Sequence, residues 1–374
     1  MNFEEYAAKP LLAAQGISVP KSELAATPAQ ARAAAGRIGP CVVKAQVPTG
    51  KRGKAGGIKL AATPEEAEGH AKNILGMDIA GWTVEKLLIE AQAPIARELY
   101  AAVLNDSDTK GPLILFSPDG GMDIEEIAEK HPERLARIPV DIRKGIDPAA
   151  LQAAIRATGE EKAEAKIQDV LARLYEGYLA NDAELLEINP LVELKDGSLV
   201  ALDCKFVLDD SAIKRRQELA ANGTPDKLTG LEAEAAGLNL KYIDLEGSVG
   251  VIANGAGLTM TTMDAVRHYG GNPANFLEIG GEAYTLAKPA LTLLLSNPNI
   301  KSLLVNFCGA FARTDVMTDG IVAAWQELKP DLPVFFSIHG TGDVEAIAMV
   351  RERLGMEPFE RMDDAVKAAV EAAR

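Results

Sequence analysis

The sequence predicts an α/β protein with more than one domain, and three observations support this prediction. Strand-like runs alternate with helical segments from residue 248 to residue 354, a pattern typical of a doubly wound parallel sheet. Residues 185–205 instead form two apolar runs joined by an Asp-Gly pair, which indicates an antiparallel hairpin. The length of 374 residues is too great for one core of ordinary size. We therefore expect two or three domains.

The composition indicates a soluble globular protein, with 47% hydrophobic and 25% charged residues. A net charge of −15 argues against nucleic acid as the main partner, because phosphate backbones need a basic surface. The first residues, MNFEEYAAK, carry acids where a secretory signal has bases, and no apolar run approaches the roughly 18 residues of a membrane helix. The three cysteines are far apart, and the four histidines lack metal-ligand spacing. These features predict a cytoplasmic protein with reduced thiols.

The first half begins with a predicted helix at residues 2–15 that ends at Gly16, with a kink or restart expected at Pro10. Further expected elements are a helix at 27–37, strands at 41–47, 86–90 and 97–104, and helices at 124–137 and 160–180. Residues 206–240 are polar and only partly helical, so we place the domain boundary there.

A glycine-rich basic segment follows the strand at 41–47. Residues 48–57 hold four glycines and three cations, so backbone N–H groups and positive charge come together. The segment is neither a Walker loop nor a GxGxxG run. It indicates a loop that covers phosphates, and the alternative is a basic surface hairpin.

The hairpin at 185–205 places polar side chains on one face. Folding about Asp196 sets Asn189 opposite Asp203 and Glu187 opposite Lys205, provided that the turn contains a bulge. Three of these four side chains offer hard oxygen ligands, and nucleotide-bound Mg²⁺ takes about one or two protein oxygens. The alternative is a solvated face with satisfied charges.

Two carboxylates near strand ends, Glu90 and Glu98, are candidates to hold a ribose or an adenine amino group, or are ordinary strand-end charges.

In the second half, strands are expected at 249–254, 275–280, 301–307 and 332–338, with helices at 257–268, 283–295, 315–327 and 341–354. Each strand is followed by a glycine-containing turn, and such turns before helices are ready anion sites. His339, at the last of these strand ends, is a candidate for a pocket role or a satisfied histidine.

These pieces, in this order, resemble the β-subunit of succinate–CoA ligase (succinyl-CoA synthetase), including its malate–CoA ligase relatives. The resemblance covers essentially the whole chain and rests on the runs MNFEEYAAKPLLAAQGI, VVKAQVPTGKRGKAGGIK, RELYAAVL, LLEINPLV, ALDCK, ANGAGLTMTTMD, GGNPANFLEIGG and VNFCGAFARTD. It implies an ATP-grasp domain at residues 1–238 and a flavodoxin-like CoA-ligase domain with a parallel sheet at 239–374.

The resemblance also implies site residues. Phosphate contacts of the family match Lys44, Lys51, Arg52 and Gly53, and its base and ribose contacts match Glu90, Ala93 and Glu98. Its magnesium ligands match Asn189 and Asp203, which agrees with the hairpin argument.

The remaining implied residues concern the partner and the acid. Glu187 matches the carboxylate that meets a phosphohistidine arriving from the α-subunit, and Lys44 and Glu187 are the expected catalytic residues. Asn254 and the segment Ala310, Phe311 and Ala312 match the carboxylate-substrate contacts. Phe311 either lines the acid site or points into the sheet.

Four segments depart from the family pattern. In the phosphate loop, Pro48-Thr49-Gly50-Lys51 replaces the family's His-Ala-Gly-Gly, and after the second strand of the second half, Gly280-Gly281-Glu282 replaces Gly-Gly-Gly. In the acid-binding loop, Cys308-Gly309-Ala310-Phe311 replaces Phe-Gly-Gly-Ile. At the end of the fourth strand, Ser337-Ile338-His339-Gly340 replaces Arg-Leu-Glu-Gly. Nucleotide chemistry is therefore better supported than succinate itself.

The implied activity is an ADP- or GDP-forming acid–CoA ligase with Mg²⁺, in which ATP or GTP, a short acid and CoA give an acyl-CoA. The expected partner is an α-subunit that carries the phosphohistidine and the CoA site. Succinate is the expected acid, as in the tricarboxylic acid cycle, with malate, itaconate or a sulfonate as alternatives. A stand-alone ATP-grasp carboxylate–amine ligase and a non-catalytic scaffold are the rival classes. The sequence leaves open the preferred acid, the nucleotide, and an αβ or α2β2 assembly.

Overall fold

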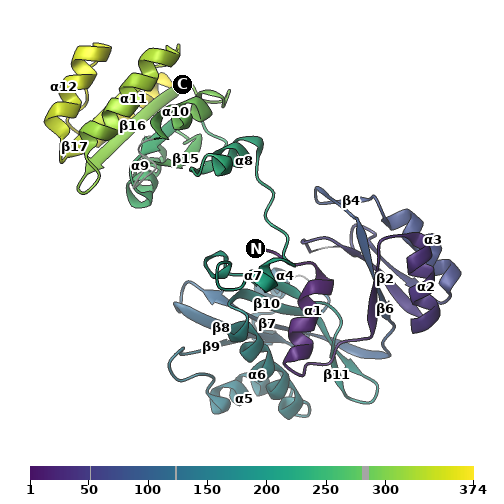
Figure 1. Cartoon of the computed structure of the whole chain (residues 1–374). Helices are drawn as coiled ribbons and strands as arrows, with labels where there is room; N and C mark the ends of the chain where they lie inside the picture. The colour runs from purple at the N-terminus through teal and green to yellow at the C-terminus, as the bar shows by residue number, and fades with distance from the viewer. Residues whose placement is uncertain (51, 123, 280–285) are drawn as a thin grey trace. The chain divides into compact units, whose positions relative to one another are not determined.

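The computed structural model describes residues 1–50, 52–122, 124–279 and 286–374 (Figure 1). It separates into two compact units, Met1–Asp226 and Lys227–Arg374. This division lies twelve residues before the boundary expected at 238. The reason is helix α8 (Gly230–Gly237), whose Ala235 is buried in the core of the second unit.

In the first unit, a four-stranded antiparallel sheet carries the glycine-rich loop. Its order is β1 (Ser22–Ala25), β6 (Lys86–Ala91), β2 (Cys41–Gln46) and β3 (Ile58–Ala61). Helices α2 (Pro28–Ile38) and α3 (Pro64–Ile74) pack against it, and each begins at a threonine whose hydroxyl accepts a backbone N–H. A two-stranded ribbon, β4 (Asp78–Ile79) and β5 (Trp82–Thr83), adjoins this core.

A second antiparallel sheet fills the rest of the first unit. Its order is β11 (Leu199–Ala201), β10 (Ala183–Leu194), β7 (Ile95–Asp106), β8 (Gly111–Ser117) and β9 (Ala136–Pro139), with β12 (Lys205–Leu208) also paired to β10. Helices α1 (Glu5–Ala14), α5 (Pro148–Ala157) and α6 (Glu164–Ala180) cover one face, and α4 (Ile124–Lys130) covers part of the other. Short helical pieces, η1 (Pro132–Arg134), η2 (Asp210–Ala212) and α7 (Gln217–Ala220), complete the unit.

The predicted hairpin register is confirmed. Glu187 pairs with Lys205, and Leu191 pairs with Ala201. The turn is the bulged type that the register required, because Leu194 N–H donates to Ser198 O while Gly197 adopts φ +78°. Glycine tolerates that backbone conformation at little cost.

The second unit contains the predicted parallel sheet. Its parallel strands lie in the order β15 (Asn275–Glu278), β14 (Val249–Ala253), β16 (Ser302–Gly309) and β17 (Val334–Gly340). Helices α9 (Ala256–His268) and α13 (Met362–Ala372) pack on one face, while α8, α10 (Ala287–Leu295), α11 (Thr314–Leu328) and α12 (Asp343–Leu354) pack on the other. This is the flavodoxin-like order, in which the switch point lies between β14 and β16.

Several sequence expectations differ from the structure. The helix expected at 124–137 ends at Lys130, because residues 136–139 join the sheet as β9. Helix α1 runs through Pro10 without a break. An antiparallel edge strand, β13 (Lys241–Asp244), and helix α13 were not predicted. No helix of the described residues is long and apolar enough to cross a membrane.

Candidate functional site

A pocket of about 430 Å³ in the first unit brings together the glycine-rich loop and the hairpin. The loop contributes Thr49, Gly50, Arg52 and Gly53. The hairpin contributes Glu187, Asn189, Asp203 and Lys205. Two segments that are remote in sequence, both singled out from their residue types, therefore line one cavity.

The candidate metal ligands already have protein partners. Asn189 Oδ1 accepts the Gly121 N–H at 2.9 Å, and its Nδ2 donates to Met122 O at 3.0 Å. Both Asp203 oxygens lie 2.7 Å from Arg52 Nη2. Asn189 and Asp203 supply hard oxygens to one pocket, as Mg²⁺ requires, but the described residues contain no group of three or more His, Cys, Asp or Glu able to hold a metal. A magnesium ion at this pair would need phosphate and water oxygens to complete its shell.

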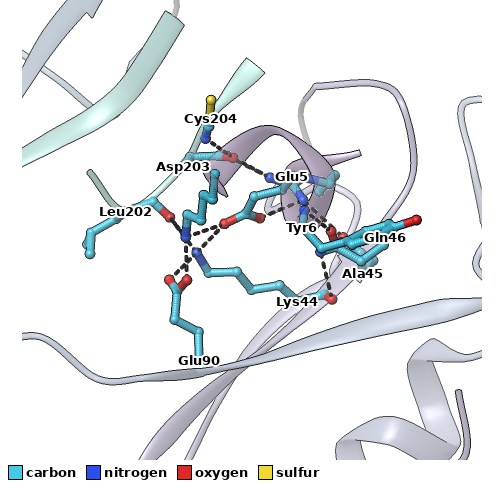
Figure 2. Close-up of polar contacts among 11 residues, drawn as sticks. Glu5, Tyr6, Lys44, Ala45, Gln46, Glu90, Leu202, Asp203 and Cys204 are labelled. Carbon is cyan, nitrogen blue, oxygen red and sulfur yellow. Dashed lines mark hydrogen bonds and ion pairs between the residues drawn. The ribbon is translucent and has the colours of Figure 1, made fainter. Parts of the chain in front are cut away.

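The candidate phosphate lysine lies in a network of six charged side chains, five of which are buried. Lys44 Nζ lies 2.9 Å from Glu5 Oε1, 2.7 Å from Glu90 Oε1 and 2.5 Å from Leu202 O (Figure 2). Its three N–H donors are therefore all used within the chain. Lys44 is 6% exposed and Glu90 is 1% exposed.

Helix α1 supplies two further members of the network, Glu5 and Lys9. Glu5 lies 2.6 Å from Lys9 Nζ and 2.8 Å from Arg52 Nη1. Lys9 also pairs with Glu90 and donates to Leu202 O at 2.8 Å. We call this set of Glu5, Lys9, Lys44, Arg52, Glu90 and Asp203 the ion network. Its three cations and three carboxylates balance.

Neighbouring charges hold Glu5 and Lys44 in their ionised forms. Burial raises the pKa of the Glu5 carboxyl, but the attraction of Lys44, Arg52 and Lys9 outweighs burial and leaves that pKa well below its usual range. Burial lowers the pKa of Lys44, yet Glu5 and Glu90 raise it above its usual value. Glu5 and Lys44 are thus both charged at neutral pH.

Glu187 has a different environment. Burial raises the pKa of its carboxyl, while Lys205 and a hydrogen bond from Tyr100 oppose the rise. The Tyr100 hydroxyl lies 3.3 Å from Glu187 Oε2 and comes from the neighbouring strand β7.

The candidate base and ribose residues differ in solvent exposure. Glu90 is committed to Lys9 and Lys44 inside the ion network, whereas Ala93 is half-buried and Glu98 is exposed. Glu98 lies against Gly121, where an added Cβ would come within 1.9 Å of Glu98 Oε2. Lys51 lies outside the described residues.

Glu5 and Lys9 were not singled out from the sequence. The spacing of an acid and a base four residues apart on an amphipathic helix is the only local signal, and such pairs are usually on the surface. Here both side chains are at most 4% exposed.

In the second unit, the candidate acid residues lie at the switch point of the sheet. Asn254 Nδ2 donates to Cys308 O at 2.9 Å, and Cys308 N–H donates to Asn254 Oδ1 at 2.8 Å. Asn254 therefore joins the ends of β14 and β16. Phe311 is fully exposed, so the interpretation that it points into the sheet is wrong.

The other residues of this edge are less buried than the strands. Ala310 is exposed and Ala312 is half-buried against the core. His339 is half-buried, with Nε2 3.3 Å from Ser337 Oγ. The expected Gly280-Gly281-Glu282 turn lies outside the described residues.

Comparisons with known proteins agree with this architecture. An ATP-grasp domain model matches residues 2–193, and a CoA-ligase domain model matches residues 252–369. The β-subunit of an ADP-forming succinate–CoA ligase from Rubrobacter xylanophilus is 43% identical, over 100% of this chain and 99% of that protein. The chain belongs to the succinate–CoA ligase β-subunit family. This family consists of subunits of nucleotide-dependent acid–CoA ligases.

Relatives with both nucleotide specificities are similar to the chain. The β-subunit of a GDP-forming succinate–CoA ligase from Thermus thermophilus is 42% identical over 92% of each chain. The solved ATP citrate lyase from Methanothrix soehngenii, in complex with citrate and coenzyme A, has a TM-score of 0.69 over 99% of each chain at 23% identity. That likeness shows the shared fold.

Proposed function

We propose that this chain is the β-subunit of an acid–CoA ligase that uses ATP or GTP, a short dicarboxylic acid and CoA. The nucleotide transfers its γ-phosphoryl group to a histidine of an α-subunit, and the histidine passes it to the acid. The CoA thiol then displaces phosphate from the acyl phosphate. The products are acyl-CoA, nucleoside diphosphate and phosphate.

The observation that carries this proposal is the pocket that joins the glycine-rich loop to the hairpin face with Glu187, Asn189 and Asp203. Glycines at 50 and 53 let the backbone approach phosphates, and Arg52 supplies positive charge. Phosphoryl transfer depends chiefly on such positioning and electrostatic stabilisation. Mg²⁺ held by Asn189 and Asp203 would neutralise charge on the phosphate oxygens.

Glu187 is proposed to meet the phosphohistidine. Glu187 is half-buried, and its carboxylate lies between Lys205 on one strand and Tyr100 on the other. A fixed carboxylate at this place would accept the imidazole N–H opposite the phosphorylated nitrogen and orient the ring.

The remaining residues have assigned parts in the same proposal. Lys51, Arg52 and Gly53 are proposed to contact the phosphates, and Lys44 to act on them through its positive charge, because its three donors are used within the chain. Glu90, Ala93 and Glu98 are proposed to act on the base and ribose. The acid is assigned to Asn254, Ala310, Phe311 and Ala312. Glu90 would act indirectly, because both of its oxygens hold lysines. The CoA-ligase domain favours this proposal over a stand-alone carboxylate–amine ligase, which would not require that domain.

Reconstitution tests the proposal. The purified chain alone should bind nucleotide with Mg²⁺ but form no acyl-CoA, and addition of the α-subunit should start synthesis from succinate or another short acid. A panel of dicarboxylic and sulfonic acids then ranks the substrates by kcat/KM. Robust acyl-CoA synthesis by the isolated chain would contradict the proposal.

A further inference from the structure

The two terminal nitrogens of Arg52 contact different groups. Nη1 lies 2.8 Å from Glu5 Oε2 and donates to Ala45 O at 3.0 Å. Nη2 lies 2.7 Å from both oxygens of Asp203. The guanidinium is therefore anchored through one nitrogen and holds Asp203 through the other.

Asp203 is the accessible member of this pair. Its side chain is 30% exposed, whereas that of Arg52 is 6% exposed. Asp203 Oδ1 also accepts the Cys204 N–H at 2.8 Å, which fixes the carboxylate orientation independently of Arg52. Loss of the Arg52 contact would remove the Nη2 donor from Asp203 Oδ2, and Asp203 lines the pocket.

We propose that Arg52 is an internal counter-ion that a divalent metal displaces from Asp203 when nucleotide binds, and that the released Nη2 then donates to a phosphate oxygen. This inference rests on the proposed function and adds an exchange step to it. Only the Nη2 contacts have to break. Glu5 and Ala45 O keep the guanidinium beside the pocket through Nη1.

Charge balance explains why the exchange needs nucleotide. The ion network has three cations and three carboxylates, so a metal that binds alone at Asp203 adds two uncompensated charges beside five buried charged side chains. Unpaired charge in a low-dielectric site is costly. Nucleotide phosphates supply the missing negative charge, so metal and nucleotide should favour each other's binding.

Lys44 is not suited to the same exchange. Its Nζ has three acceptors, from Glu5, Glu90 and Leu202 O, and none of these is a candidate metal ligand. Arg52 is the cation whose displacement uncovers Asp203.

Binding experiments on the full chain separate metal from nucleotide. Free Mn²⁺ is measured by electron paramagnetic resonance without nucleotide, and ADP binding in the presence of Mg²⁺ is measured by calorimetry. Arg52→Gln should bind Mn²⁺ alone on the order of tenfold more tightly than wild type, because a charge-assisted contact no longer competes. The same variant should bind ADP with Mg²⁺ on the order of tenfold more weakly. A merely structural role would not move these two affinities in opposite directions.

Two further variants and a control complete the design. Adding Asp203→Asn to Arg52→Gln should abolish the gain in Mn²⁺ affinity, because the uncovered carboxylate is removed. Arg52→Lys keeps the charge but loses the fork, so its shifts should have the same signs and smaller size. Arg37→Gln removes an arginine–carboxylate pair with Glu23 that is exposed and should change neither affinity.

The results separate this inference from the proposed function. Unchanged or weaker Mn²⁺ binding by both Arg52→Gln and Arg52→Lys overturns the exchange. If Arg52→Gln lacks a cooperative thermal transition, Arg52→Lys decides the question by the same two measurements. Wild-type chain that binds no nucleotide with Mg²⁺ defeats the proposed function, whatever the metal-only result.

Discussion

Replacing Glu5 by glutamine tests whether the ion network stabilises the first unit. The side chain is 1% exposed and contacts three buried cations, at 2.6 Å for Lys9, 2.9 Å for Lys44 and 2.8 Å for Arg52. The variant leaves the network with one excess positive charge. Removing one partner from a buried ion pair costs about 3–5 kcal/mol. Each of the three cations keeps another carboxylate partner, so we expect the lower end, about 3 kcal/mol.

Urea unfolding measures this cost. The chain has two tryptophans, Trp82 in the first unit and Trp325 in the second, so a Trp325→Phe background leaves fluorescence that reports the first unit alone. Glu23→Gln is the matched control, because it removes a carboxylate from an exposed pair with Arg37 in the same unit. If Glu5→Gln shifts the unfolding midpoint no more than Glu23→Gln does, the network is not a major source of stability.

Three further predictions follow from the same two regions. The pKa of Glu5 is depressed in the folded state, so the stabilisation from its carboxylate is fully present above the unfolded-state pKa of about 4.3 and is lost as the pH falls below that value. Between pH 6 and pH 3, the free energy of unfolding should therefore fall less for Glu5→Gln than for the wild type. Asp203→Ala should slow phosphorylation of the α-subunit on the order of a hundredfold with an unchanged circular dichroism spectrum, and a wild-type rate throughout a magnesium titration would exclude Asp203 as a ligand. Phe311→Ile should shift the kcat/KM ranking toward succinate within roughly ten- to two-hundredfold, and an unchanged ranking with succinate already first would show that the acid site is not reshaped.

The features predicted correctly from the sequence depend on short-range patterns. The register of the hairpin follows from the period-two side-chain pattern and from a turn whose glycine adopts φ +78°. The parallel sheet of the second unit follows from strands and helices that alternate at regular spacing. In both cases neighbouring residues determine the element, and a few sequence positions carry the signal.

The ion network could not be predicted because its contacts are long-range. Lys44 and Glu5 are 39 positions apart, and Arg52 and Asp203 are 151 apart. The identities of these residues do not say which pairs will meet once two sheets and a helix pack together. The helix expected at 124–137 failed for a related reason: its last two residues, 136 and 137, pair with β8 and belong to strand β9 instead.

The preference of the enzyme among acid substrates should be tested by substituting Phe311 before Asn254. Asn254 has two roles, and a substitution there would change both at once. Its amide accepts from and donates to the Cys308 backbone, so it fixes the end of β16 from which the Ala310–Ala312 segment begins. Removing Asn254 would displace that segment as well as any contact with the acid, and a change in KM would have two explanations. Phe311 is fully exposed among the residues that the structure describes. Its substitution therefore changes the surface offered to an acid or an α-subunit while leaving the support from Asn254 in place.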